Sequence, residues 1–282
     1  MENYCRLIEW GSAMTKFIKK EQTIKDFGHQ WQIHGQLRED HWSSDQMFRD
    51  HFPKDFDFSI FYDSNVLEIG SGSGRILNML SAYSPSILIG IEPSNGFSNL
   101  VLNTNSISNL RLENTTGANF NEKNLDVIIS LGVVHHIPEA SEVVRNAFNS
   151  LKKGGYFIMW VYGYENNRLY VISQKMIRIF TRFLPDFLLD KLSLLVSYIF
   201  DFYGVFSRIL FKSNLPLSGY YSNVFSKCGR REKKHIIFDQ LNPSYAKYYT
   251  KSEVIRLLNS NGFIDIEMFH RHGYSWTSIA KK

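Results

Sequence analysis

A glycine-rich turn holds the residues whose types and spacing point most clearly to chemistry. Gly70, Gly72 and Gly74 alternate with serines, between an apolar segment at residues 66–69 and a helix-like segment at residues 75–80. Glycines at such a turn let the backbone bend sharply and let a ligand approach the amide groups. The N-terminus of the following helix would face that ligand. The turn therefore predicts a small-molecule site at the end of a buried parallel strand.

The spacing of these glycines argues against a nicotinamide dinucleotide. The dinucleotide fingerprint requires Gly-x-Gly-x-x-Gly or Ala. Counted from Gly70 its last position is Arg75, and counted from Gly72 it is Leu77. The fingerprint fails both ways, so a different ligand is expected at this turn.

Two acidic residues accompany the turn. Glu68 precedes the first glycine by two residues, and Glu92 follows Gly70 by 22 residues, at the end of a second apolar segment at residues 87–91. A carboxylate at the tip of the second strand can accept hydrogen bonds from both ribose hydroxyls of an adenosine ligand. Glu92 therefore favours a nucleoside ligand.

The segments that must position these residues alternate between strand-like and helix-like patterns. Residues 126–131 form another buried strand, and residues 139–151 place their apolar side chains on one face of a helix. Residues 156–162 then form a fifth-strand candidate. Such alternation predicts a parallel sheet with helices on both of its faces.

The end of the chain adds one more helix and two strands. Residues 250–253 have the form of a capping box, and the helix that they begin ends at Asn261 and Gly262. Residues 263–269 alternate between apolar and polar side chains, and residues 274–280 form a last strand after a tight turn.

The ordered motifs over residues 66–162, with the pattern Glu68-x-Gly70-x-Gly72-x-Gly74, resemble class I S-adenosylmethionine-dependent methyltransferases. The resemblance implies an α/β fold, a Rossmann-like seven-stranded mostly parallel sheet with an antiparallel last strand. It also implies an enzyme with S-adenosyl-L-methionine as its cofactor. An α-helical cap inserted between the fifth strand and the closing helix is expected in addition.

The resemblance assigns a set of residues to the cofactor. Ala118 stands where related enzymes often carry an acid, so adenine contacts are left to backbone groups or to the neighbouring asparagine. The cofactor-binding residues that we expect are Glu68, Gly70, Ser71, Gly72, Gly74, Glu92, Pro93, Asn119, Phe120 and Leu131.

Two histidines follow the fourth strand, at the edge of the sheet that faces the acceptor. Methyl transfer is an in-line displacement, and a neutral hydroxyl acceptor must also lose its proton as it attacks. Histidine suits that task near neutral pH, so His135 and His136 are the candidate catalytic residues, with the choice between them open. The plainer interpretation is a histidine that orders the loop. No metal ion is expected to take part.

Four residues near the end of the chain are candidates for substrate binding: Tyr248, His270, His272 and Tyr274. The alternative for the last three is a polar turn between the last two strands.

The chain divides into four parts by these patterns: an N-terminal segment and expected lid at 1–64, a cofactor-binding core at 65–163, a helical cap and substrate insertion at 164–245, and a closing part at 246–282.

The insertion is dense in apolar residues. Pro185 and Gly204 are expected to split it into two or three helices. A cap on the sheet, a dimer interface and a membrane-facing surface are the three alternatives for its role. The basic residues within 227–235 form a solvated loop or hold a phosphate of the acceptor.

Composition limits the cellular setting. The 282 residues carry a net charge of +5, which is compatible with anionic substrates without implying nucleic acid. Cys5 and Cys228 form neither a disulfide framework nor a metal cluster, which favours a reducing cytoplasm. The N-terminus lacks the features of a signal peptide, and no apolar run is long enough to span a membrane.

The acceptor predicted from these observations is a small molecule or a sugar, methylated at oxygen. Residues 239–245 and 271–276 resemble, more loosely, methyltransferases of bacterial surface-polysaccharide clusters. The sequence leaves open whether the acceptor bears a phosphate or a lipid. It also leaves open whether the protein contacts a membrane peripherally, at its inner face, and what its oligomeric state is.

Two rival functions remain. The first is an RNA or protein methyltransferase, although residues 130–133 read Ser-Leu-Gly-Val, where enzymes that methylate amines of nucleic acids carry Asn or Asp-Pro-Pro-Tyr or Phe. The second is a cofactor-binding protein without transferase activity.

Overall fold

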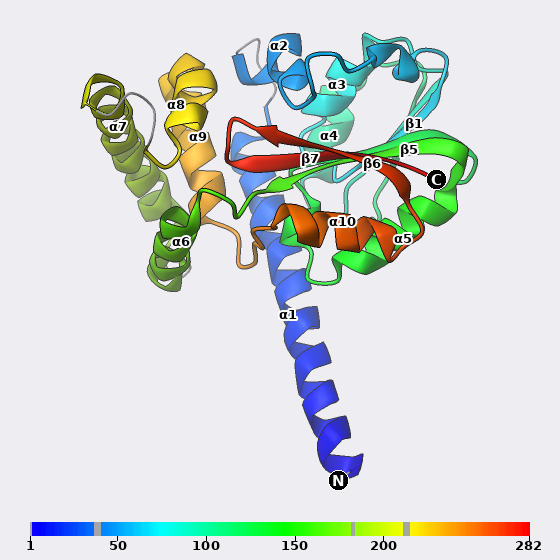
Figure 1. Ribbon diagram of the computed structural model, residues 1–282, viewed down its shortest axis with the longest axis horizontal. Coiled ribbons are helices and arrows are strands. Elements are labelled where there is room, and N and C mark those ends of the chain that lie inside the picture. The colour runs from blue at the N-terminus through cyan, green and yellow to red at the C-terminus, as the bar shows by residue number, and fades with distance from the viewer. Residues whose placement is uncertain (1, 37–40, 182–183, 211–214) are drawn as a thin grey trace.

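A seven-stranded sheet forms the centre of the protein, as the computed structural model shows (Figure 1). The structure describes residues 2–36, 41–181, 184–210 and 215–282, with the backbone alone at 2–17, 42, 208 and 210. Its strand order is β3-β2-β1-β4-β5-β7-β6. The strands are β1 (Asn65–Ile69), β2 (Ile87–Ile91), β3 (Leu110–Glu113), β4 (Leu125–Leu131), β5 (Leu151–Tyr162), β6 (Ile264–Arg271) and β7 (Ser275–Lys281).

The pairing confirms the fold that the sequence predicts. Strands β1 to β5 pair in parallel, whereas β7 runs antiparallel to both β5 and β6. Because the order reverses between β1 and β4, the carboxyl ends of these two strands flank a crevice in which such sheets bind ligands.

Helices cover both faces of the sheet. Apolar side chains of α5 and α10 pack on one face, and those of α2, α3 and α4 pack on the other. The helices are α1 (Glu2–His34), α2 (Asp45–Arg49), α3 (Arg75–Ser81), α4 (Phe97–Asn103), α5 (Ala140–Ser150), α6 (Arg168–Thr181), α7 (Asp186–Leu210), α8 (Ser218–Asn223), α9 (Arg230–Leu241) and α10 (Lys251–Asn259). Short 3-10 helices lie at His41–Ser43, Phe58–Phe61, Val134–His136 and Phe225–Lys227. None of the helices, as far as the structure describes them, combines the length and the apolar character needed to cross a membrane.

The last turns of α1 are tied to the helix that follows β2. The Asn99 side-chain amide donates to the Trp31 carbonyl at 2.7 Å, and that of Asn103 donates to the Gly35 carbonyl at 2.6 Å. These bonds hold the end of α1 beside the glycine turn.

Helices α6 to α9 form the insertion, and two expectations about it are wrong. Gly204 does not break a helix but lies within α7, where a Cβ atom would come within 2.2 Å of the Tyr221 ring. The residue is therefore a point of close packing, at which only a hydrogen atom fits.

The basic segment at 227–235 is not a solvated loop, because most of it forms the start of α9. Lys233 and Arg230 bind the Asp201 carboxylate at 2.7 and 2.6 Å, and Lys234 binds that of Asp190 at 2.6 Å. The acids of α7 thus neutralise most of the run, and the pairs join the two helices.

Candidate active site

A cavity of about 720 Å³ opens at the carboxyl edge of the sheet. Its lining comes from the turns after β1, β2 and β4, from α1, and from helices α6, α7 and α9 of the insertion. The volume lies in the range of small-molecule sites in proteins. Segments far apart in the chain therefore meet around one space.

The glycine turn forms one wall of this cavity. Gly70, Gly72 and Gly74 all have positive φ angles, of 76°, 53° and 85°. A Cβ atom on Gly72 would come within 2.9 Å of the Trp31 indole, so both the conformation and the space require glycine there. The amides of Gly70 and Ser71 donate to the Ile91 carbonyl at 2.9 Å, which fixes the turn against the end of β2.

Glu68 is buried at the base of the turn and lines the cavity. Its Oε2 atom has no hydrogen-bond partner among the described residues. Burial raises the pKa of Glu68 to about 8, against the opposing effects of a hydrogen bond from Ser71 and the positive charge of Arg75. A carboxyl group in this state is prepared for a positively charged partner.

Glu92 holds the other side of the turn. Its two carboxylate oxygens accept hydrogen bonds from the backbone amides of Gly72 and Ser94, both at 3.0 Å. An ionised carboxylate offers about four lone-pair sites, so acceptor capacity remains for a ligand. Glu92 lines the cavity together with Pro93.

Three of the ten residues predicted to bind the cofactor do not line the cavity. Gly74 caps the start of α3, Phe120 packs in the core, and Asn119 is exposed to solvent. The backbone and side chains of 116–118 line the cavity instead, where the Thr116 hydroxyl has no hydrogen-bond partner in the described structure. The adenine contacts that were expected from Asn119 thus have no support in the geometry.

The two histidines differ in their access to the cavity. His136 lines it, whereas His135 is fully buried, with its ring centroid 3.9 Å from that of Tyr162. Neither ring nitrogen of His135 has a hydrogen-bond partner among the described residues, and burial lowers its pKa well below the usual value. His135 is therefore a packed side chain beneath the site.

His136 has a defined tautomer. Its Nδ1 atom lies 2.8 Å from the Tyr245 carbonyl oxygen, which can only accept, so Nδ1 carries the proton and Nε2 keeps a lone pair. Burial lowers the pKa of His136 to about 4, although the charge of Asp239 opposes the shift. The imidazole is therefore neutral near pH 7 and can accept a proton at Nε2.

A polar network from β5 and α9 lies at the far end of the cavity. The Tyr162 hydroxyl donates to Oδ2 of Asp239 at 3.1 Å and accepts from the Gln240 side chain at 2.7 Å. Gln30 of α1 donates to the other oxygen of Asp239 at 3.0 Å. All of these residues but Gln30 line the cavity.

Aromatic rings complete this end of the cavity. Tyr248 stacks on Tyr162 with ring centroids 5.4 Å apart, and Tyr170 meets Tyr248 edge to face. Tyr248 has a buried hydroxyl without a hydrogen-bond partner in the described part of the chain. Ring surfaces and polar groups thus alternate around the same space.

Of the four predicted substrate contacts, Tyr248 and Tyr274 line the cavity and His270 and His272 do not. His270 stacks on Trp276 at 4.0 Å, and His272 Nε2 lies 2.8 Å from the Asp50 carboxylate. His270 of β6 and His272 of the turn between β6 and β7 thus make contacts outside the ligand space.

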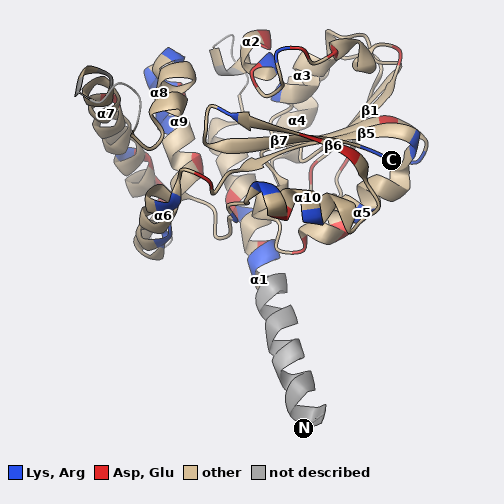
Figure 2. Cartoon of the chain, in the orientation of Figure 1, with Lys and Arg blue, Asp and Glu red and all other residues tan. Residues whose placement is uncertain are grey.

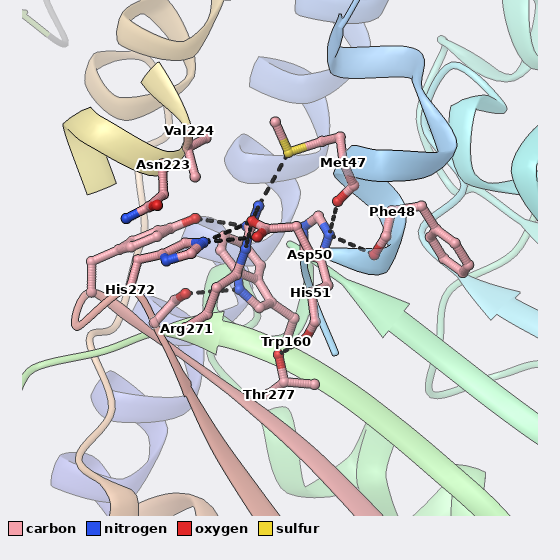
Figure 3. A network of polar contacts seen from close by, with 12 residues as sticks. Met47, Phe48, Asp50, His51, Trp160, Asn223, Val224, Arg271, His272 and Thr277 are labelled. Atoms are coloured by element: carbon pink, nitrogen blue, oxygen red, sulfur yellow. Dashed lines mark hydrogen bonds and ion pairs between the residues drawn. The ribbon is translucent and has the colours of Figure 1, made fainter. Parts of the chain in front are cut away.

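The contacts of that turn nevertheless support the cavity wall. Figure 3 shows Arg271 and His272 both reaching Asp50. Arg271 is only 1% exposed, and its Nη1 atom donates to the Tyr274 hydroxyl at 2.7 Å. Burial acts to raise the pKa of Asp50, but His272 and Arg271 together outweigh it and hold that pKa below its usual value. The network positions Tyr274 beside Trp160.

Asp239, Gln240 and Tyr162 were not singled out as site residues from the sequence. Tyr162 could have been found from the sequence, because it ends β5 and the carboxyl ends of parallel strands lie at the same edge of the sheet. Asp239 and Gln240 lie in the segment 239–245 that carries the looser resemblance, but nothing in that segment assigns them to the site, and only the packing of α9 over that edge brings them in.

The comparisons with known proteins agree with this geometry. Residues 67–159 match the family described as "Methyltransferase domain". A tRNA U34 carboxymethyltransferase of Desulfotalea psychrophila is 26% identical over 120 residues, which cover 38% of this chain and 35% of that relative. The match thus spans about a third of the relative's length.

Solved structures overlay more of the chain. An S-adenosylmethionine-dependent methyltransferase from Mesorhizobium loti aligns with a TM-score of 0.49 at 11% identity, over 85% of this chain and 98% of that one. Human N-acetylserotonin methyltransferase, solved with S-adenosylmethionine, aligns with a TM-score of 0.47 at 12% identity, over 80% and 49% of the two chains.

Proposed function

We propose that this class I S-adenosylmethionine-dependent methyltransferase moves the methyl group of its cofactor to an oxygen of a small-molecule or saccharide acceptor. The observation that carries the proposal is the position of His136. Its unprotonated Nε2 belongs to a side chain that lines the same cavity as the glycine turn. A base and a cofactor site that share one space are what oxygen methylation needs.

The residues around the turn suit the cofactor. S-adenosylmethionine supplies a methyl group on a positively charged sulfur, together with an amino group, a ribose and an adenine. The unpartnered carboxyl of Glu68 would receive the positive methionine end, and Glu92 would hold the ribose. Trp31, packed on Gly72, would close over the ligand with the end of α1 as a lid.

His136 would take the acceptor's proton. As the acceptor oxygen bonds to the methyl carbon and that carbon's bond to sulfur breaks, which leaves neutral S-adenosylhomocysteine, the hydroxyl becomes acidic and its proton passes to Nε2. The imidazolium that results keeps its Nδ1–H bond to the Tyr245 carbonyl and gains from the charge of Asp239. The low pKa of about 4 means that the proton is released again readily.

The far end of the cavity favours an acceptor with a ring and several hydroxyl groups. Aromatic faces of Tyr162 and Tyr248 offer packing surfaces, while Asp239 and Gln240 offer hydrogen bonds. A sugar, as in polysaccharide biosynthesis, combines both requirements. Arg231 at the cavity wall is the group that would meet a phosphate on such an acceptor.

A cytoplasmic location suits this chemistry. Cys228 is buried and forms no disulfide with any residue that the structure describes, as is usual in a reducing compartment.

RNA methylation is the second candidate, because the curated relative is named as a tRNA-modifying enzyme. The basic run at 227–235 gives it little support, since Arg230, Lys233 and Lys234 are paired with acids of α7. Free cations along a groove would be needed to follow a phosphate backbone.

The experiment is incubation of the protein with S-adenosylmethionine carrying a deuterated methyl group, with separate sugar, nucleotide-sugar, lipid-linked sugar and RNA fractions. Mass spectrometry should find the labelled methyl on a hydroxyl group of a sugar fraction. His136→Ala should lower the rate by about 10²–10⁴, whereas His41→Ala, in the short 3-10 helix His41–Ser43 and outside the cavity lining, should leave it unchanged. Label in RNA alone would establish the second candidate instead.

A further inference from the structure

The outermost helices of the insertion expose an unusual amount of apolar surface. Of the 22 exposed large apolar side chains in the described residues, 16 lie on α6 and α7. They include the aromatic rings of Phe180, Phe187, Tyr198 and Phe202, each more than half exposed. Soluble monomers rarely expose so many large apolar groups on one face, so this face is expected to meet a partner.

Helix α7 is inverted relative to an ordinary surface helix. Ser193, Ser197 and Ser207 are almost completely buried, together with Gly204, while ten large apolar side chains of α7 are exposed and only a few, such as Leu189 and Phe200, pack inward. Figure 1 places α7 at the outer edge, with α9 between it and the sheet. An ordinary helix buries its large apolar face and exposes its small polar residues. The inversion indicates that the outer face of α7 meets an apolar medium.

The exposed face of α6 and α7 also differs in charge from their inner face. Every exposed charged residue in their described part is cationic, namely Arg168, Lys175 and Lys191. Lys191 lies four residues from both Phe187 and Leu195, so its charge sits within the apolar face.

The acids of α7 point the other way. Asp186 pairs with His29 of α1, and Asp190 pairs with Lys234 of α9. Asp201 pairs with both Arg230 and Lys233 of α9. Figure 2 shows α7 mostly without charge. An apolar face that carries only positive charges is complementary to a surface that is apolar inside and negative outside.

We propose that the face formed by α6 and α7 docks on the surface of an anionic lipid bilayer. Aromatic and aliphatic side chains would enter the boundary between headgroups and acyl chains, and the lysines would remain among the headgroups. Two copies of the chain would oppose like charges if this face paired with itself, which disfavours a dimer through it. The net charge of +5 acts in the same sense.

The docking face lies on the back of the cavity wall. Tyr170 and Gln174 of α6, and Val196 and Phe200 of α7, line the cavity from the side opposite to the exposed face. On the proposed function, docking would hold the enzyme near an acceptor carried by a lipid. The docking itself does not depend on that function.

The experiment is co-sedimentation of the whole chain with vesicles, without cofactor or acceptor. The protein should bind vesicles that contain phosphatidylglycerol and bind vesicles of phosphatidylcholine alone much more weakly. Replacing Lys175 and Lys191 by Gln should weaken binding about 25-fold, at about fivefold for each lysine near an anionic surface. Phe202→Ser should weaken it about tenfold or more. The matched controls, Lys123→Gln and Leu102→Ser, alter equally exposed residues elsewhere and should have no effect.

Cofactor affinity, measured on every variant, separates docking from folding and from the proposed function. Equal affinity with lost vesicle binding supports the docking face. Absence of vesicle binding overturns the proposal, and a dimer by light scattering that Phe202→Ser dissolves would assign the face to a second copy. Binding that the controls weaken as much as the variants would also overturn it.

Discussion

The protonation of Glu68 should make cofactor binding depend on pH. Its pKa of about 8 means that the carboxyl is mainly neutral at pH 7 in the free protein. A cofactor with a positive sulfur and a positive amino group favours the ionised form, so binding should expel the proton. The affinity should therefore rise with pH below 8.

The size of the effect follows from the shift. Each pH unit below the pKa costs about 1.4 kcal/mol to ionise the group, which is about tenfold in the dissociation constant. Between about pH 5.5 and about pH 7.5 the constant should fall about 100-fold, while the cofactor's amino group stays charged. His136, with a pKa of about 4, stays neutral over this range and adds no slope.

Isothermal titration calorimetry in two buffers of different ionisation enthalpy would measure both the affinity and the proton released. The Glu68→Gln variant keeps the shape of the neutral side chain and should lose most of the slope. The raised pKa also predicts that the free protein becomes less stable as pH rises from about 5 toward 8, since the folded chain holds a proton that the unfolded chain has lost. Equal slopes for the wild type and the Gln variant would refute the reasoning.

Three further outcomes are expected. Gly72→Ala should lower the free energy of unfolding by about 1–3 kcal/mol and weaken cofactor binding through the contact with Trp31, whereas Gly154→Ala, also at positive φ but with open space, should not affect binding. Asp50→Ala should lower the free energy of unfolding, measured by chemical denaturation, by about 3–5 kcal/mol, because it leaves the buried Arg271 without its carboxylate partner. The wild type should lose this stability as the pH falls through the lowered pKa of Asp50. With the cofactor saturating, kcat/KM for the acceptor should show no rise between about pH 6 and 8, because a pKa of about 4 keeps Nε2 of His136 unprotonated there.

The sheet was predictable because its strands and turns are encoded locally. The glycine turn and Glu92 mark the carboxyl ends of β1 and β2, and the capping box at Thr250 appears as predicted, with the hydroxyl accepting from the Glu253 amide at 3.2 Å. The short strand β3 and helix α4 were not predicted, because too few residues form each to show a period.

The helical parts were harder to predict because long-range packing decides them. Helix α1 has no single apolar stripe, and its last turns are held by Asn99 and Asn103 of a distant helix. The cations of α9 were predicted to be solvated because their partners, Asp190 and Asp201 of α7, are distant in the sequence.

Long-range contacts also decide which of the predicted site residues face the cavity. His135 and His136 are neighbours in sequence, yet only the bond to the Tyr245 carbonyl decides which ring is held with a free nitrogen. His272 looked like a substrate contact until Asp50, distant in the sequence, supplied its partner.

A crystal structure with S-adenosylhomocysteine tests the central claim most directly. The account predicts the product in the cavity, with its amino group at Glu68, its ribose hydroxyls at Glu92 and its sulfur directed toward His136 and Tyr162. A product bound outside this cavity, or with its ribose remote from Glu92, would contradict the account.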